Sequence, residues 1–173
     1  CDLDLSNLTY AKDLVLPKTM NGSLDLKNLT KIENLKLPQY VKYSLLLNSL
    51  PSAEGLILPE TIGGNLCLNS LSSAKDLTLP QSVGGHLLLD SLPSAEGLKL
   101  PQSIGGNLEL WNLRDAKNII FPETIGKNLY FCMLKNAEGL IVPQNFSYEY
   151  LRSNYITMDD LKKVSENSDI KSK

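Results

Sequence analysis

The chain has 173 residues, of which 42% are hydrophobic and 21% are charged, a composition typical of one soluble domain. Its 17 basic and 19 acidic side chains are interleaved and give a formal net charge of −2, so there is no basic stripe to neutralise a nucleic-acid backbone. No apolar run approaches the roughly 20 residues that cross a bilayer. We therefore expect no nucleic-acid partner and no membrane span.

A proline recurs every 21 residues and defines the organisation of the chain. The prolines stand at positions 17, 38, 59, 80, 101, 122 and 143, with no insertion or deletion between them. A fixed period of this length is typical of a solenoid, in which each repeat is one coil stacked on the next. The pattern predicts a mainly β solenoid with two short strands in each coil. Cys1 falls within a coil, so we expect the chain to be a fragment or a processed product.

The first expected strand of each coil ends at the proline. Apolar residues stand one and three positions before it, as Leu56 and Leu58 do before Pro59, and this alternation predicts an inward-facing strand. Proline cannot donate to a ladder, so it should close the strand. The residue before the strand is always Asp, Asn or Gly, which tolerate positive φ and predict a left-handed corner: Asp13, Asn34, Gly55, Asp76, Gly97, Asn118 and Gly139.

A glycine-rich bend follows the proline in several coils. Lys42 and Tyr43 replace both glycines in one coil, so we expect no strict backbone requirement for glycine at this bend. The second strand comes next, with inward leucines seven and nine positions after the proline, such as Leu87 and Leu89. A polar substitution at Leu87 should therefore be far more harmful than one at the outward-facing Leu88.

Any recognition surface should lie in the outward positions of this second strand. One outward column holds Asp25, Leu46, Cys67, Leu88, Glu109 and Tyr130, and its neighbour holds Lys27, Asn48, Asn69, Asp90, Trp111 and Cys132. Trp111 is the only tryptophan, and we expect it to point out of the sheet, diagonal to Tyr130 and beside Glu109. Exposed Trp and Tyr are favoured binding anchors. The predicted partner-binding residues are Trp111, Tyr130, Glu109, Leu88, Asp90 and Leu46. The alternative is that the apolar and aromatic members of these columns only pack in cross-strand ladders or beneath the cap.

Catalytic and metal-binding patterns are not found in the sequence. The single histidine, His86, shares a column with Ser and Asn, which indicates a corner that hydrogen-bonds the backbone. Cys67 and Cys132 stand three coils apart, beyond the reach of a disulfide, and the cysteines and histidine lack zinc-site spacing. Asp90 and Glu109 fit a solvated face better than an acid-base pair. We expect no catalytic residue, no metal and no cofactor, and thus no enzyme.

The repeat pattern breaks near the C-terminus. Tyr150 and Arg152 fall in inward leucine columns, so stacking should end after Phe146. The predicted domains are a solenoid over 1–147, a cap over 148–167 and a disordered tail over 168–173.

The cap is expected to contain a short helix at about 157–167. Thr157 is a suitable N-cap, and Asp159 and Asp160 would complement the positive end of the helix dipole in its first turn. Ile156 and Leu161 have the spacing of a hydrophobic staple. Such a helix would cover the last coil and protect its sheet edges.

The stretches LILPETIGGNLCLNSL and LKLPQSIGGNLELWNL resemble bacterial leucine-rich repeats, nearest to the BspA-like surface antigens. The resemblance covers residues 1 to about 147, with a 21-residue period. It implies a leucine-rich repeat solenoid that serves as a protein interaction surface, secreted or displayed on a bacterial cell, for adhesion or host interaction. The expected partner is a protein, with a glycan second. An alternative is that the array is a targeting arm or rigid spacer for an effector or enzyme encoded elsewhere in a longer chain.

Overall fold

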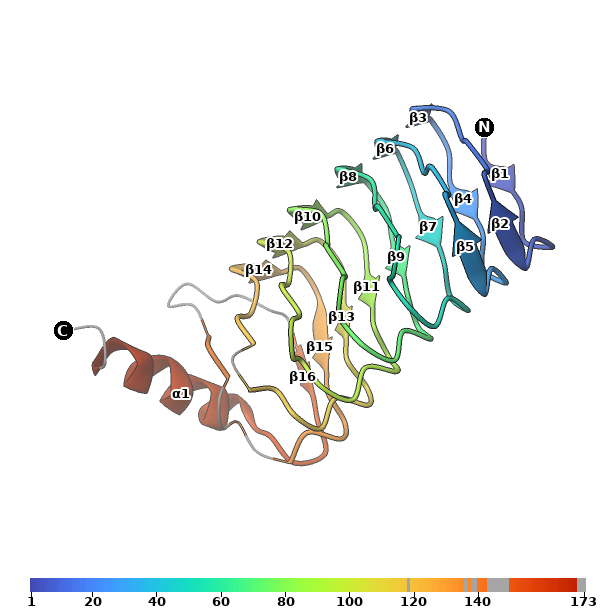
Figure 1. Ribbon diagram of the computed structural model, residues 1–173. Coiled ribbons are helices and arrows are strands. Elements are labelled where there is room, and N and C mark those ends of the chain that lie inside the picture. The colour runs from blue at the N-terminus through green and yellow to red at the C-terminus, as the bar shows by residue number, and fades with distance from the viewer. Residues whose placement is uncertain (118, 136, 138–139, 143–149, 171–173) are drawn as a thin grey trace.

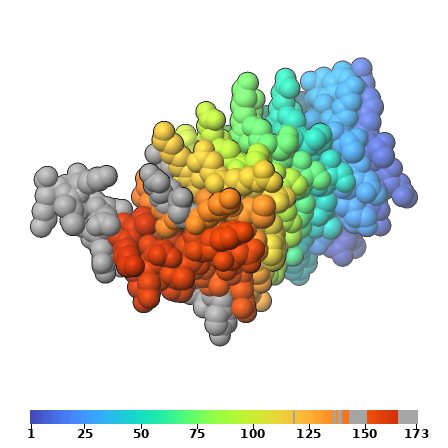
Figure 2. Space-filling view, turned by 90° about the horizontal axis from the view of Figure 1, so that it is seen from below, coloured from blue at the N-terminus to red at the C-terminus, as the bar shows by residue number. Residues whose placement is uncertain are grey.

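The computed structural model describes residues 1–117, 119–135, 137, 140–142 and 150–170, with side chains described as far as 164 in the C-terminal helix. The chain winds into a solenoid of parallel coils that follow one another in chain order along its length (Figures 1 and 2). Residues 21 apart are cross-strand partners, as in Leu66 with Leu87 and Leu87 with Leu108. The predicted mainly β solenoid with two short strands per coil is confirmed.

Within the described residues, the strands form three parallel sheets. The eight-stranded sheet contains, in spatial order, β1 (Leu3–Asp4), β4 (Leu24–Asp25), β7 (Leu45–Leu46), β9 (Leu66–Cys67), β11 (Leu87–Leu88), β13 (Leu108–Glu109), β15 (Asn128–Tyr130) and β16 (Tyr150–Arg152). The six-stranded sheet contains β3 (Thr19–Met20), β6 (Tyr40–Val41), β8 (Thr61–Ile62), β10 (Ser82–Val83), β12 (Ser103–Ile104) and β14 (Thr124–Ile125). A two-stranded sheet joins β2 (Tyr10–Lys12) to β5 (Lys31–Glu33).

The core is a continuous apolar column that runs through the coils. In the second strand of successive coils, from β4 to β15, the inward leucine is 0% exposed, and so is the residue two positions later. The first set is Leu24, Leu45, Leu66, Leu87, Leu108 and Leu129, and the second is Leu26, Leu47, Leu68, Leu89, Leu110 and Phe131. Leu87 is fully buried whereas Leu88 is half-buried, in agreement with the expected inward and outward alternation. Because every coil buries its leucines against its neighbours, stacking holds the fold together.

The proline precedes a hydrogen-bonded strand, so the prediction that it ends one is wrong. The strands of the six-stranded sheet begin two residues after the proline, as β8 does after Pro59. Before the proline the backbone still alternates inward and outward, but among the described residues only two isolated bridges, Val15 with Lys36 and Ile120 with Ile141, join coils there. A residue that lacks an N–H is tolerated at the entrance to a strand, where no donor is required.

The left-handed corners are present where the sequence predicts them. The backbone φ is 51° at Asp13, 54° at Asn34, 72° at Gly55, 63° at Asp76 and 77° at Gly97. The two remaining predicted corners, at 118 and 139, lie outside the described residues. Only residue types that tolerate positive φ occupy these described corners.

The glycine bend has a steric requirement that the sequence pattern did not predict. A Cβ added at Gly84 would lie 2.3 Å from the carbonyl oxygen of Gly63 in the coil below. The expectation that glycine is not strictly needed is therefore wrong where glycine stacks on glycine. The reason is close approach of two backbones, since Gly84 does not have positive φ.

The solenoid sheet continues further than the sequence predicts. β16 pairs with β15 so that Leu151 is opposite Leu129 and Arg152 is opposite Tyr130. One additional residue relative to the 21-residue period shifts the register, and Arg152 joins the outward column instead of an inward one. The side chain of Tyr150 and the predicted last inward residue, Phe146, lie outside the described residues.

The C-terminal helix, α1 (Met158–Ile170), lies at the end of the solenoid (Figures 1 and 2). The Thr157 hydroxyl accepts a bond of 3.2 Å from the amide of Asp160, whose carboxylate accepts one of 2.9 Å from the amide of Thr157. This reciprocal cap confirms Thr157 as the N-cap. Ile156 and Leu161 are both buried. The helix runs three residues beyond the predicted end at 167.

Candidate functional site on the eight-stranded sheet

The outward face of the eight-stranded sheet carries all six predicted partner-binding residues. Strand register places Leu46, Cys67, Leu88, Glu109, Tyr130 and Arg152 side by side in one column. Asp90 and Trp111 come two residues after Leu88 and Glu109, in the next outward column. Each coil contributes one strand to this sheet, so residues that are far apart in the sequence lie side by side.

Trp111, which is partly exposed, stacks on the half-buried Tyr130. Their ring centroids are 4.8 Å apart with an interplanar angle of 26°, and Trp111 is 37% exposed. The Trp111 indole Nε1 donates a hydrogen bond of 2.9 Å to Oε2 of Glu109. Stacking and this hydrogen bond together fix the indole orientation, and one part of the ring remains open to solvent.

Glu109 and Asp90 add two carboxylates beside the aromatic pair. Oε1 of Glu109 accepts a bond of 3.0 Å from Nδ2 of Asn107, so each of its oxygens is held by a neutral donor. Asp90 accepts a bond from Nδ2 of Asn69, and its Oδ1 is buried without a hydrogen-bond partner. Burial raises the pKa of Asp90, and the Glu109 charge raises it further against the opposing effect of the Asn69 bond. We call Asp90, Glu109, Trp111 and Tyr130 the aromatic-acidic patch.

The N-terminal part of this outward column, from Leu46 to Leu88, is packed and largely covered. Cys67 is only 7% exposed between the half-buried Leu46 and Leu88. Burial raises the pKa of the Cys67 thiol to about 11, with smaller contributions from Asp90 and Glu109, so this thiol stays protonated. The interpretation of outward residues as a cross-strand packing ladder thus describes this part well, whereas the aromatic-acidic patch combines packing with exposure.

The predicted backbone role of His86 is confirmed. Its Nδ1 accepts a bond of 2.8 Å from the amide of Asn107, and its own amide donates one of 2.8 Å to Oδ1 of Asn65. The corner column is therefore a ladder in which each side chain accepts from the amide one coil above. A second ladder, Asn48 to Asn69 to Asp90, was not predicted, although amide residues at the same place in successive coils are its sequence signal.

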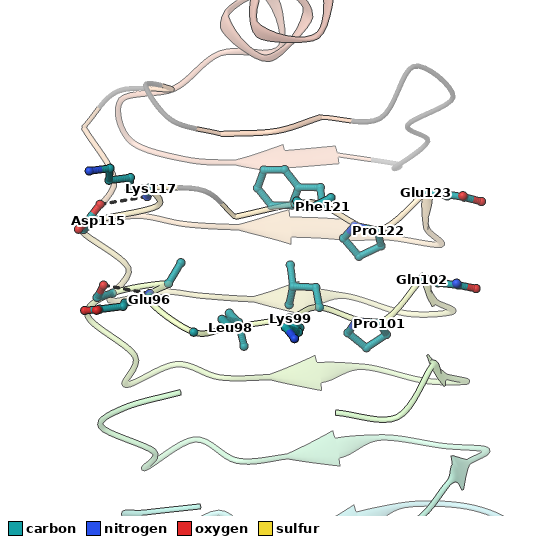
Figure 3. Close-up of a pocket in the computed structure, with 15 residues that line it drawn as sticks. Glu96, Leu98, Lys99, Pro101, Gln102, Asp115, Lys117, Phe121, Pro122 and Glu123 are labelled. Carbon is teal, nitrogen blue, oxygen red and sulfur yellow. Dashed lines mark hydrogen bonds between the residues drawn. The ribbon is translucent and has the colours of Figure 1, made fainter. Parts of the chain in front are cut away.

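A cavity that sequence reasoning missed lies on the segments around two prolines (Figure 3). It has a volume of about 820 Å³ and lies between the coil at 94–102 and the coil at 115–123. Leu98, Pro101, Phe121 and Pro122 line it, and Leu98 and Phe121 belong to the core. No isolated bridge or strand pair joins the described residues 98–100 to the next coil, whereas a bridge between Ser94 and Asp115 joins the two coils at one end of the cavity.

The three cysteines are free thiols. Among the described residues, no three His, Cys, Asp or Glu side chains gather closely enough to hold a metal ion. No helix in the described part of the chain is both long and apolar enough to cross a membrane.

The sequence matches no protein-family model, and comparisons with curated proteins and with solved structures gave no match. The class of protein is therefore defined by the structure itself, as a parallel β-solenoid repeat protein with a 21-residue period.

Proposed function

We propose that this solenoid is a noncatalytic recognition module that holds a protein partner against the outward face of its eight-stranded sheet. The observation that carries the proposal is the partly exposed Trp111, which stacks on the half-buried Tyr130 and donates a hydrogen bond to Glu109. Tryptophan and tyrosine dominate the binding energy of many protein interfaces because they bury large areas at little entropic cost.

Pre-ordering of the patch supports this proposal. The Trp111 ring is already oriented by Glu109 and Tyr130, so a partner would lose little free energy in ordering it. Four strand intervals separate Leu46 from Tyr130, which at about 4.8 Å per strand gives roughly 20 Å of surface. That length suits an extended segment or a small protein face.

The resemblance to bacterial leucine-rich repeats of the BspA-like type suggests the setting. In the proposed setting the module is secreted or displayed on a bacterial cell and takes part in adhesion or host interaction. A glycan is the second candidate partner, because an exposed indole face beside carboxylates also suits sugar stacking.

A displayed peptide library tests the proposal directly. Peptides selected on the wild-type protein are expected to lose binding to Trp111→Ala and Tyr130→Ala, because these substitutions remove the anchors. Ile57→Ser is the matched control, since Ile57 is an exposed apolar residue on the segment before Pro59, outside the eight-stranded sheet. Circular dichroism confirms that each variant is folded.

Two outcomes would contradict the proposal. Selected peptides that bind the Trp111 and Tyr130 variants as well as they bind wild type would place recognition elsewhere. Failure to select any binder, while a glycan array gives a signal that depends on Trp111, would favour the glycan. A complete gene product with an appended catalytic domain would favour the spacer alternative.

A further inference from the structure

Neither carboxylate of the aromatic-acidic patch forms an ion pair with a basic side chain of the described residues. Within the described residues the ion pairs are Lys12 with Glu33, Lys27 with Asp25, and Lys162 with Asp159, and neither Asp90 nor Glu109 is in one. Arg152 is the basic residue of the same outward column, but Tyr130 separates it from Glu109. In the part of the chain that the structure describes, Asp90 and Glu109 thus have no ion-pair partner.

A second coil on the same face shows the compensated arrangement. Asp25 occupies the column of Glu109, and Lys27 occupies the column of Trp111. The Lys27 ammonium lies 3.5 Å from the Asp25 carboxylate. In the later coil, an indole replaces the lysine and the carboxylate keeps its charge. The sheet face itself supplies a cation at Asp25, and the equivalent position beside Glu109 is left for a cation from a partner.

Glu109 retains acceptor sites for a cation. Each Glu109 oxygen accepts one hydrogen bond, from Trp111 or Asn107, and a carboxylate has about four acceptor sites. Trp111, the donor of one of these bonds, is 37% exposed. A guanidinium group can stack on an aromatic face and donate in-plane hydrogen bonds to a carboxylate at the same time, whereas an ammonium is a point charge without a stacking plane.

We propose that the partner presents an arginine whose guanidinium stacks on Trp111 and donates to Glu109, with the Asp90 charge deepening the negative potential. This inference rests on the proposed function, and it adds the chemistry of the partner segment. Charge complementarity selects the occupant, because both carboxylates are free of an internal cation while the equivalent Asp25 is not. Asp90 contributes to arginine binding through its charge and not through a hydrogen bond, since its Oδ1 is buried and out of reach of the partner.

The single tryptophan makes the test specific, because the Trp111 indole N–H gives one resonance in a ¹H–¹⁵N spectrum. Acetyl-arginine amide is titrated into the full chain at low salt and again at about 0.5 M ionic strength. A saturable shift of the indole resonance is expected, and it should weaken with salt. Acetyl-citrulline amide, the neutral isostere, should give no saturable shift, and acetyl-lysine amide (the free ε-ammonium form) should bind less tightly than arginine.

Three variants assign the interaction. Glu109→Gln should weaken arginine binding about tenfold or more, because it removes the ion pair while an oxygen remains for the indole hydrogen bond. Asp90→Asn should weaken it by a smaller factor. Asp25→Asn is the matched control and should leave it unchanged, since Lys27 already neutralises Asp25.

The results separate the two proposals. Equal shifts with citrulline and arginine, or unchanged binding in a folded Glu109→Gln variant, would overturn the arginine inference. If library peptides still required Trp111 in that case, the recognition surface would stand and only its charge preference would be wrong. If they did not require Trp111 either, both proposals would fail.

Discussion

At the residue scale, backbone conformation explains the most informative single column of the repeat. Asp13, Asn34 and Asp76 have positive φ, as do Gly55 and Gly97. These residue types pay the smallest penalty in the left-handed region, so the corner was predictable from residue type alone. The contact between Gly84 and Gly63 was not predictable, because it depends on how closely two coils approach and leaves no trace in φ.

Gly55→Ala should destabilise the solenoid by about 1 kcal/mol, because alanine is strained at positive φ. No heavy atom lies within 4 Å of a Cβ added there, so a steric clash does not contribute. Gly55→Asn is the control and should have a much smaller effect, since Asn34 occupies the equivalent corner. Urea unfolding measures both changes. Equal stability of the alanine and wild-type proteins would show that the corner carries no strain.

Asp90→Asn should stabilise the protein near pH 7 and have little effect near pH 3. Burial and the Glu109 charge raise the pKa of Asp90 in the folded state, so folding favours the protonated carboxyl. The stability that this group contributes is present below its unfolded pKa and is lost as pH rises through the folded pKa. The neutral amide keeps the bond to Asn69 without the charge.

Thermal unfolding across this pH range measures the Asp90 effect. The difference in Tm between the variant and wild type should grow with pH and then level off. Asp25→Asn, at an ion-paired site on the same face, serves as the control. A difference that shrinks with rising pH would contradict the assigned direction.

At the element scale, the two strands of a coil were not equally predictable. The leucine alternation of the second strand identified its inward face, because period-2 burial is a local property of an extended chain. The first strand was placed on the wrong side of the proline. The segment before the proline also alternates, but among the described residues only two isolated bridges join it between coils. Whether a segment pairs with the next coil depends on how closely the two coils approach each other. The residue pattern within one coil does not show that distance.

The register of β16 shows the same limit. The sequence predicted that stacking stops before Arg152, whereas one additional residue restores Leu151 to the position opposite Leu129. A pattern with a fixed 21-residue period gives the wrong register after an inserted residue. In the folded chain, an additional strand can still pair with the open edge of the sheet, because the edge has unpaired backbone groups.

The two faces of β11 give a prediction for the strand as an element. Leu87→Ala should destabilise the protein by about 2–5 kcal/mol, because it leaves a cavity in the fully buried column. Leu88→Ala should have a clearly smaller effect, since its side chain is half-buried on the outward face. Chemical denaturation of both variants gives the comparison. Similar losses at the two positions would mean that β11 does not separate a core face from an outer face.

At the scale of the whole molecule, the strict 21-residue repeat places equivalent residues of successive coils next to each other. The stacking of residues 21 apart is why Trp111, Tyr130 and Glu109 could be grouped from the sequence. The hydrogen bonds from Trp111 and Asn107 to Glu109, and the cavity near Phe121, depend on side-chain rotamers and coil spacing. Those features needed the three-dimensional structure.

The free energy of unfolding should also depend mainly on the contacts between stacked coils. Each coil contacts its neighbours, the Thr157-capped helix lies at the C-terminal end, and the ladders of Asn side chains link coils through their backbone amides. In such an array the interface between coils contributes most of the stability, so local damage spreads to adjacent coils first.

The most direct measurement is of through-hydrogen-bond scalar couplings between backbone amide nitrogens and carbonyl carbons in solution. The parallel stack predicts couplings from the amide of Leu45 to the carbonyl of Asn65, from Leu66 to His86, and from Leu87 to Asn107, across bonds of 2.8 Å each. Observation of this series, advancing by one coil each time, would establish the register on which the recognition face depends. Couplings between residues four apart in the sequence, or none linking successive coils, would contradict it.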